Sequence, residues 1–155
     1  MKKTILFTFL FFISFVNACA KQQTIQQHIK TVSSEDISAL TPEQVVILYF
    51  QAWTDKQYDV MYSLISDGFK QIESTAKTFE DFKSNMEKFY DTDLGVRVLE
   101  VKESYKTDNE AGVDYKIEII GKDGTKREFS SAYTLKKRTN GWKLIHPYGE
   151  NIDTT

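Results

Sequence analysis

The apolar side chains of this chain follow helical spacing from about residue 42 to residue 89 and strand spacing after that. The first helix is predicted to run to about Thr54, because its apolar residues recur at intervals of three and four and form one stripe. Thr41, Pro42 and Gln44 indicate its start, since they match the pattern of a capping box with proline in the first turn. The stripe consists of Val45, Leu48, Tyr49, Ala52 and Trp53.

Two further helices are predicted before the period changes. One covers Tyr58 to Ser66 and ends where Asp67-Gly68 interrupts the apolar pattern. The other follows the capping residue Thr78 and continues to about Phe89. The turn between the first two helices is short, so we expect them to pack antiparallel.

From Val96 onward the apolar positions alternate with polar ones, which predicts strands. In the strand over 113–119, apolar residues alternate with Asp114, Lys116 and Glu118, and we expect these three on a solvated face. Asx-Gly pairs at 123–124 and 140–141 predict tight turns into strands over 129–135 and 142–146. The pattern therefore predicts an α+β domain, with three N-terminal helices packed on a curved antiparallel sheet of about four strands.

The N-terminus has the layout of a secretory signal. Lys2 and Lys3 precede an apolar run that ends near Val16, too short to span a bilayer. The segment Val16-Asn17-Ala18-Cys19 resembles the bacterial lipobox, and Cys19 is the only cysteine of the chain. We expect cleavage between Ala18 and Cys19; the resemblance implies a diacylglycerol thioether and an amide-linked acyl chain, such as palmitate, on Cys19. The alternative is an ordinary signal peptide with an incidental cysteine.

These features divide the chain into three parts. Residues 1–18 are the expected lipoprotein signal peptide, 19–40 the lipidated cysteine with a polar, Gln- and Ser-rich tether, and 41–152 a single domain. Cys19 would anchor the protein in a membrane of the cell envelope. Ala20, rather than aspartate, follows Cys19, and in this the chain resembles lipoproteins that are sent to the outer membrane. In a cell with two membranes we therefore expect it to face the periplasm from the outer membrane. In a cell with a single membrane we expect it on the outer face of the plasma membrane.

Charge argues against a nucleic-acid partner. Removing residues 1–18 leaves eighteen basic and twenty-two acidic residues, a net charge of about −4. The charges are interspersed, and no long run of one sign suggests a polybasic membrane patch.

Three segments carry a resemblance to the nuclear transport factor two-like superfamily: residues 41–46, 53–59 and 140–145. The first opens a helix, the second forms a helix turn, and the third closes a hairpin with Asn140-Gly141-Trp142. The resemblance spans 41–152 and implies the cone-shaped fold found in ketosteroid isomerase and in many small bacterial lipoproteins. Because this fold also occurs in dehydratases, carriers and binding modules, it implies no single function.

Candidate chemistry is sparse. The chain has no Gly-rich phosphate loop, no metal-spaced His or Cys cluster and no serine nucleophile motif, so we expect no cofactor and no metal site. The resemblance places Tyr49 where ketosteroid isomerases donate a tyrosine hydroxyl, and Glu73 near their general base. In those isomerases the base is an aspartate followed by proline, whereas this chain has Glu73-Ser74. The alternatives are a packing aromatic for Tyr49 and a solvated loop carboxylate for Glu73.

A possible pocket inside the cone would be lined by Tyr49, Trp53, Glu73, Tyr133, Trp142 and His146, with His146 predicted on the last strand. Our main hypothesis is an anchored, non-enzymatic domain that binds a small apolar ligand or an envelope protein. One alternative is a cone-type isomerase or dehydratase that uses a pocket tyrosine and a carboxylate. The other is a structural protein that forms a homodimer through the outer face of its sheet.

Overall fold

The computed structural model describes residues 37–147, which belong to the unit Ser33–Thr155. The predictions for the leader, for Cys19, for the tether up to residue 36 and for residues 148–152 lie outside the described residues. Within the described part, no helix is both long and apolar enough to cross a membrane.

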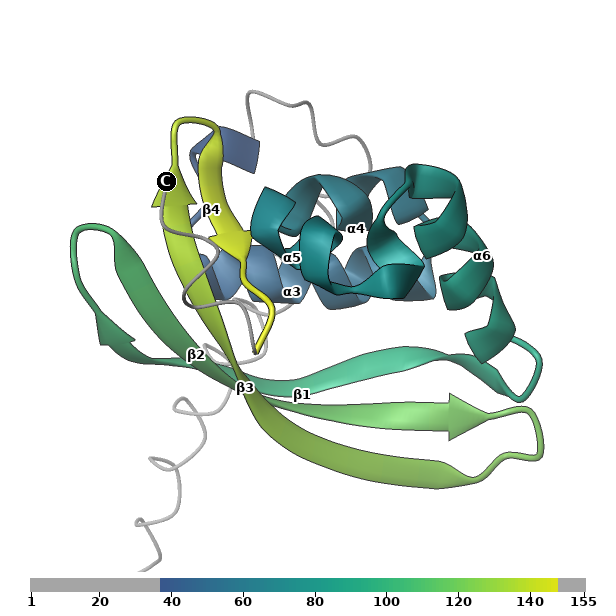
Figure 1. The fold of residues 1–155 in the computed structure, drawn as a ribbon. Coiled ribbons are helices and arrows are strands. Elements are labelled where there is room, and N and C mark those ends of the chain that lie inside the picture. Colours follow the sequence, from purple (N-terminus) through teal and green to yellow (C-terminus); the bar gives the residue numbers. More distant parts are fainter. Residues whose placement is uncertain (1–36, 148–155) are drawn as a thin grey trace, which may run out of the picture. The chain divides into compact units, whose positions relative to one another are not determined.

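A layer of helices packs on one face of an antiparallel sheet, and this confirms the predicted α+β class (Figure 1). The strands lie in the sequential order β1-β2-β3-β4, each pairing with the next. The helical elements are α3 (Pro42–Thr54), α4 (Tyr58–Leu64), α5 (Asp67–Ile72), the 3-10 turn η1 (Ser74–Ala76) and α6 (Phe79–Phe89). The strands are β1 (Asp93–Lys106), β2 (Glu110–Gly121), β3 (Lys126–Arg138) and β4 (Gly141–Leu144).

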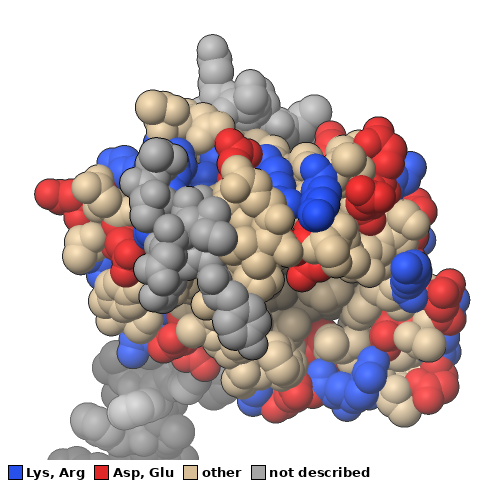
Figure 2. Space-filling model, viewed as in Figure 1, with Lys and Arg blue, Asp and Glu red and all other residues tan. Residues whose placement is uncertain are grey.

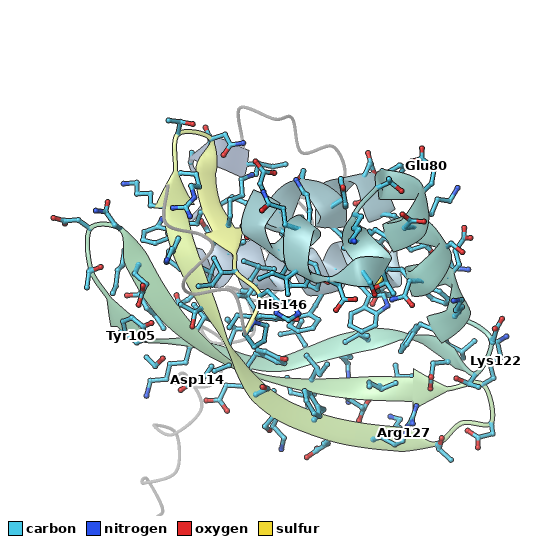
Figure 3. The ribbon with its side chains drawn as sticks, viewed as in Figure 1. Glu80, Tyr105, Asp114, Lys122, Arg127 and His146 are labelled. Carbon is cyan, nitrogen blue, oxygen red and sulfur yellow. The ribbon has the colours of Figure 1, made fainter. Side chains whose placement is uncertain are left out.

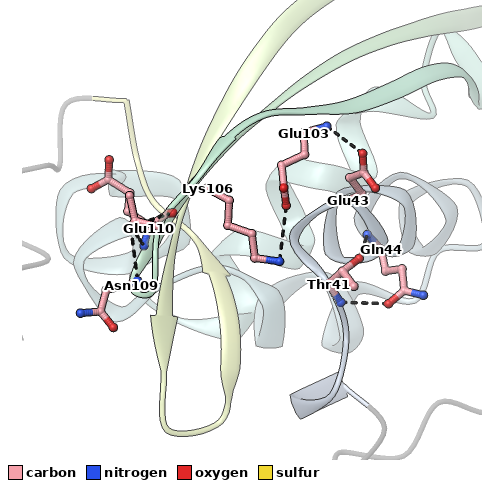
Figure 4. Close-up of polar contacts among 8 residues, drawn as sticks. Thr41, Glu43, Gln44, Glu103, Lys106, Asn109 and Glu110 are labelled. Carbon is pink, nitrogen blue, oxygen red and sulfur yellow. Dashed lines mark hydrogen bonds and ion pairs between the residues drawn. The ribbon is translucent and has the colours of Figure 1, made fainter.

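Helix α3 begins and ends where the sequence predicts. The side chain of Thr41 accepts from the backbone N–H of Gln44, and the Gln44 side chain accepts from the Thr41 N–H, so the capping box is complete (Figure 4). Four of the five residues of the α3 stripe are buried, with Val45 fully covered and Tyr49 7% exposed, and the fifth, Trp53, is half-buried. This packing fixes the position of the aromatic side chains on α3.

The region after α4 differs from the prediction. The sequence pattern predicts a break at Asp67-Gly68, but these residues begin the separate helix α5. The hydroxyl of Ser66 accepts from the N–H of Phe69 and caps α5, while Ser66 N–H donates to the carbonyl of Leu144 on β4. The chain therefore turns at Ile65 and Ser66 and starts a new helix beside the last strand.

Helix α3 also covers the free edge of β1. The Thr54 hydroxyl donates to the carbonyl of Val96 at 2.6 Å and accepts from its N–H at 3.0 Å. Toward the other end of α3, the Glu43 carboxylate accepts from the N–H of Glu103 at 2.8 Å (Figure 4). Both contacts satisfy backbone groups that an edge strand would otherwise present for pairing with another chain.

The outer face of the sheet carries cross-strand ion pairs. Arg97 contacts Glu118 at 3.0 Å, and Lys116 contacts Glu128 at 2.6 Å. The alternation predicts a solvated Glu118, but this residue is only 6% exposed, because Arg97 and Lys126 both reach over its carboxylate. The alternation of polar and apolar residues therefore predicts the correct face for Glu118. It does not predict the burial of its carboxylate by long basic side chains on that face.

Candidate functional site

Six aromatic side chains of α3, β2 and β3 are connected by ring contacts, and we call them the aromatic cluster; the contacts continue from Trp53 to Phe89 of α6, at 4.8 Å. Its centre is Phe50, whose ring centroid lies 4.9 Å from that of Tyr115 and 6.1 Å from that of Tyr133. Tyr115 and Tyr133 are stacked at 4.9 Å with an interplanar angle of 23°. The members of the cluster are Tyr49, Phe50, Trp53, Tyr115, Phe129 and Tyr133.

The aromatic cluster is buried at α3 and open to solvent on β3. Phe129 pairs across the sheet with Ile117, which is 3% exposed, and both therefore point to the inner face. Phe129 is nevertheless 51% exposed, so the helices do not cover this part of the face. Figure 2 shows a recess between the helical layer and the sheet. We call this opening the recess. Phe129 and the half-buried Tyr133 lie on the inner face of β3, which is the side of the sheet toward the helical layer.

A carboxylate–imidazole pair lies where the end of α5 approaches the segment after β4. Glu73 Oε2 is 3.6 Å from His146 Nε2, and the His146 ring meets Phe69 of α5 edge to face at 5.0 Å. The sequence predicts His146 on the last strand, but β4 ends at Leu144. The N–H of Ile145 still donates to the carbonyl of Thr134, which keeps the chain beside β3 up to His146.

This register places His146 near the level of Tyr133 on the inner face. Leu144 of β4 pairs with Leu135 of β3 in antiparallel register. Every second residue of a strand points inward, so the next inward residue after Leu144 is His146, and the one before Leu135 is Tyr133. In Figure 3 His146 lies between the helical layer and the sheet. The Glu73–His146 pair therefore lies between the helical layer and the sheet, at the level of Tyr133, and we call this pair the rim.

The environment of Glu73 favours its charged form. The backbone N–H of Thr75 donates to Oε1 at 3.1 Å and the Thr75 hydroxyl at 2.8 Å. These hydrogen bonds, followed by the nearby His146, lower the pKa of Glu73 below its ordinary value. Glu73 is thus a carboxylate at neutral pH, with a third of its side chain exposed.

Burial has the opposite effect on the tyrosines. It raises the pKa of Tyr49, and the neighbouring Tyr115 raises it further. The pKa of Tyr133 is raised well above its ordinary value by burial, by Tyr49 and by Tyr115. Both hydroxyls therefore stay neutral across the physiological range.

The two tryptophans predicted to line the pocket lie in different places. Trp53 stacks on Phe50 at 6.3 Å, and its indole Nε1 is buried without a hydrogen-bond partner among the described residues. Trp142 is buried at the start of β4, where Lys106 and Lys137 each lie 5.9 Å from its ring centroid. It is not in ring contact with the aromatic cluster in the described part of the chain.

The structure thus brings together Tyr49, Trp53 and Tyr133, and separately pairs Glu73 with His146. The pocket predicted from the sequence lacks three members of the cluster. The strand alternation that places Tyr133 inward also places Tyr115 and Phe129 inward, and that signal could have found them. The third is Phe50, which widens the apolar stripe of α3. Across residues 37–147 no group of three or more His, Cys, Asp or Glu side chains is arranged to hold a metal ion.

The family model and the first of the two solved structures below agree with this architecture. The family described as NTF2-like N-terminal transpeptidase domain matches residues 41–147. A SEC-C motif-containing protein from Rhodopseudomonas palustris is 13% identical, with 73% of this chain and 81% of that chain covered and a TM-score of 0.55. An NTF-2-like protein of unknown function from Shewanella oneidensis is 12% identical, with coverages of 66% and 90% and a TM-score of 0.48. The comparison with curated proteins gives no match.

Proposed function

This chain belongs to the NTF2-like N-terminal transpeptidase domain family, and from that premise we propose that it is a non-enzymatic binding domain held at the outside of a cell membrane by a lipid on Cys19. The ligand is a small, ring-bearing compound that enters the recess. The observation that carries the proposal is Phe129, an aromatic side chain on the inner face of the sheet that is 51% exposed.

Exposed aromatic surface in a concave site is what a small apolar ligand requires. Ligand pockets are lined mainly by apolar and aromatic side chains, with a few polar groups that orient the ligand. Phe129 and Tyr133 supply the apolar wall, and Glu73 with His146 supplies polar groups at the rim. Burying rings of this size contributes on the order of 25 cal/mol per Å² of apolar area.

The protonation behaviour of the two isomerase candidates favours binding over catalysis. A general base works best with a pKa close to the working pH, yet the hydrogen bonds from Thr75 lower the pKa of Glu73. Burial raises the pKa of Tyr49, which makes its hydroxyl a weaker acid. Each group is shifted away from the value that proton transfer needs, so we propose no reaction.

The outer face of the sheet does not favour a homodimer through apolar contact. Its cross-strand positions hold alternating charges such as Arg97, Glu118 and Lys116, which already pair within one chain. Interface cores are depleted of charged residues. We therefore propose that the domain acts through its recess.

Anchoring is supported by the lipobox-like Val16-Asn17-Ala18-Cys19 and by the absence of any other cysteine from the sequence. Two or three acyl chains on Cys19 would hold the protein firmly, at about 0.8 kcal/mol for each buried CH₂ group. Mass spectrometry of the protein isolated from cells is expected to find an N-terminal Cys19 carrying the lipid. An unmodified thiol would refute the anchoring.

Ligand binding can be tested on the full mature chain, because it has only two tryptophans. With 5-fluorotryptophan incorporated, Trp53 reports on the aromatic cluster by ¹⁹F NMR and Trp142 serves as an internal control. The probes are 2-phenylethanol, the 2-phenylethylammonium ion and the 3-phenylpropanoate ion. We expect at least one of them to shift the Trp53 resonance saturably and to leave Trp142 unchanged.

The matched variants are Phe129→Ser and Leu94→Ser, since both remove an exposed apolar side chain, 51% and 58% exposed respectively. Leu94 lies at the start of β1, outside the aromatic cluster. Phe129→Ser is expected to weaken binding, whereas Leu94→Ser keeps it. Failure of all three probes to shift Trp53, or equal loss in both variants, would rule out the recess as a binding site.

A further inference from the structure

We infer that the ligand of the recess is an organic cation, whose apolar body lies against the aromatic wall that Phe129 and Tyr133 form and whose ammonium head lies beside the carboxylate of Glu73. This inference rests on the proposed binding function and specifies the chemical class of the ligand. Two independent features carry it, the charge of the rim and the chemistry of the wall.

Within the described part of the chain, the rim offers a negative charge without a permanent positive partner. Among the described residues, the ion pair of Glu73 is with His146, which is charged only when protonated. Thr75 donates two hydrogen bonds to Oε1, and the other oxygen, Oε2, faces His146 at 3.6 Å. A ligand cation therefore meets a carboxylate that is partly desolvated and not already neutralised by a lysine or arginine in the described part of the chain.

The wall offers aromatic faces. Cations are attracted to the faces of Tyr, Trp and Phe rings, with about 0.5–1 kcal/mol at exposed sites and about 2 kcal/mol when the cation is desolvated. Phe129 presents an exposed ring, and its centroid lies 6.3 Å from that of the buried Tyr115 ring. The Tyr133 hydroxyl remains neutral, so it adds no competing charge.

Nearby fixed charges do not reverse this preference. Arg127 lies two positions before Phe129 on the same face of β3, but its guanidinium is paired with the buried Asp93. On α5, Lys70 is paired with Asp67 at 3.0 Å. On β4, the buried Lys143 donates to the backbone carbonyl of Ser63. None of these three basic groups is paired with Glu73 in the described part of the chain, so its carboxylate attracts a cationic ligand and repels an anionic one.

The experiment compares two probes of nearly equal size on the full mature chain labelled with 5-fluorotryptophan. At pH 7 the 2-phenylethylammonium ion carries a positive head, and 2-phenylethanol has a neutral hydroxyl in its place. We expect the cation to bind about tenfold more tightly than the alcohol, and the anion 3-phenylpropanoate to bind more weakly than either. Raising the ionic strength is expected to reduce the preference for the cation.

The matched variants are Glu73→Gln and Glu80→Gln. In Glu73→Gln the side-chain amide oxygen can still accept from Thr75, so the turn after α5 keeps its hydrogen bonds while the charge is lost. Glu80 is an acid on α6, far from His146 in Figure 3, and its change removes the same charge elsewhere. The preference for the cation is expected to disappear in Glu73→Gln and to persist in Glu80→Gln.

The outcomes separate this inference from the proposed function. If 2-phenylethanol binds as tightly as the ammonium ion, the recess is a binding site and the cation inference is wrong. If no probe shifts Trp53, the binding function itself fails. Should Glu73→Gln not fold, equal affinities for the two probes in wild-type protein at low and high salt would still overturn the inference.

Discussion

Thr54 closes the edge of the sheet with one hydroxyl group, and its replacement by valine gives a sharp test of the fold. The hydroxyl donates to the carbonyl of Val96 and accepts from its N–H, so one side chain satisfies both backbone groups of a residue that is 6% exposed. Thr54→Val has nearly the same shape but can form neither bond. Thr54→Ser keeps the hydroxyl and serves as the control.

The magnitude follows from what is left unpaired. Each of the two hydrogen bonds contributes about 0.5–1.5 kcal/mol to the free energy of unfolding, and leaving the buried donor and acceptor without partners adds a further cost. Together these effects lower the free energy of unfolding by about 2–3 kcal/mol. The valine methyl would also stand where the hydroxyl now approaches Val96 to 2.6 Å, which is too close for carbon. For a folded unit of this size, each kcal/mol lowers Tm by about 4 °C.

We therefore expect Thr54→Val to melt about 8–12 °C below wild type by far-ultraviolet circular dichroism. Thr54→Ser should stay within about 3 °C, because it loses only a methyl group. Size-exclusion chromatography of Thr54→Val should also show oligomers, since the free backbone groups of β1 can pair with another chain. If the valine and serine variants melt together, the hydroxyl does not stabilise this edge and the reasoning is wrong.

Three other predictions concern the backbone and one charge. Gly141→Ala should destabilise the domain by at least about 1 kcal/mol more than Gly124→Ala in urea unfolding. Both glycines have positive φ, but a Cβ at Gly141 would lie 2.9 Å from the Cα of Ser38, whereas nothing lies within 4 Å at Gly124. Equal urea midpoints for the two variants would contradict this. Lys56→Gly should raise the free energy of unfolding by about 0.5 kcal/mol, because Lys56 follows α3 with a φ of 57°, a conformation that glycine adopts more easily. An unchanged urea midpoint would count against this prediction. Because the folded pKa of Glu73 lies below its ordinary 4.5, its charge stabilises the fold above that pH, and this contribution is lost as the pH falls through the lowered pKa. The stability of wild type relative to Glu73→Gln should therefore be larger at pH 6 than at pH 3, and a difference independent of pH would refute it.

Much of the fold could be predicted because its signals are local. The capping box at Thr41 and the cap at Thr78 each involve residues three positions apart, and both helices begin where these caps predict. The two turns at 124 and 141 need a positive φ, and glycine supplies it at both. Such features are fixed by neighbours along the chain, so the sequence pattern is enough to place them.

The exceptions arise where a distant partner decides the local structure. Asp67-Gly68 is a weak helix pattern by itself, but Ser66 is held against Leu144 of β4, and the chain can then start α5. Glu118 alternates as a solvent-facing residue, but Arg97 on the neighbouring strand covers it. Both partners lie more than twenty positions away, where periodicity carries no information.

The candidate site is set by the same kind of distant contact, and this explains which part of it could be foreseen. Tyr49 and Tyr133 each lie on an element with a clear period, so their inward direction follows from the sequence. Glu73 and His146 both lie in connections just after an element ends, where no period applies. Their pairing depends on the hydrogen bond from Ile145 to Thr134, which keeps the chain beside β3 after β4 has ended. A substitution that disturbs this bond should therefore separate the charge at the rim from the aromatic wall, although neither Glu73 nor Phe129 has been changed.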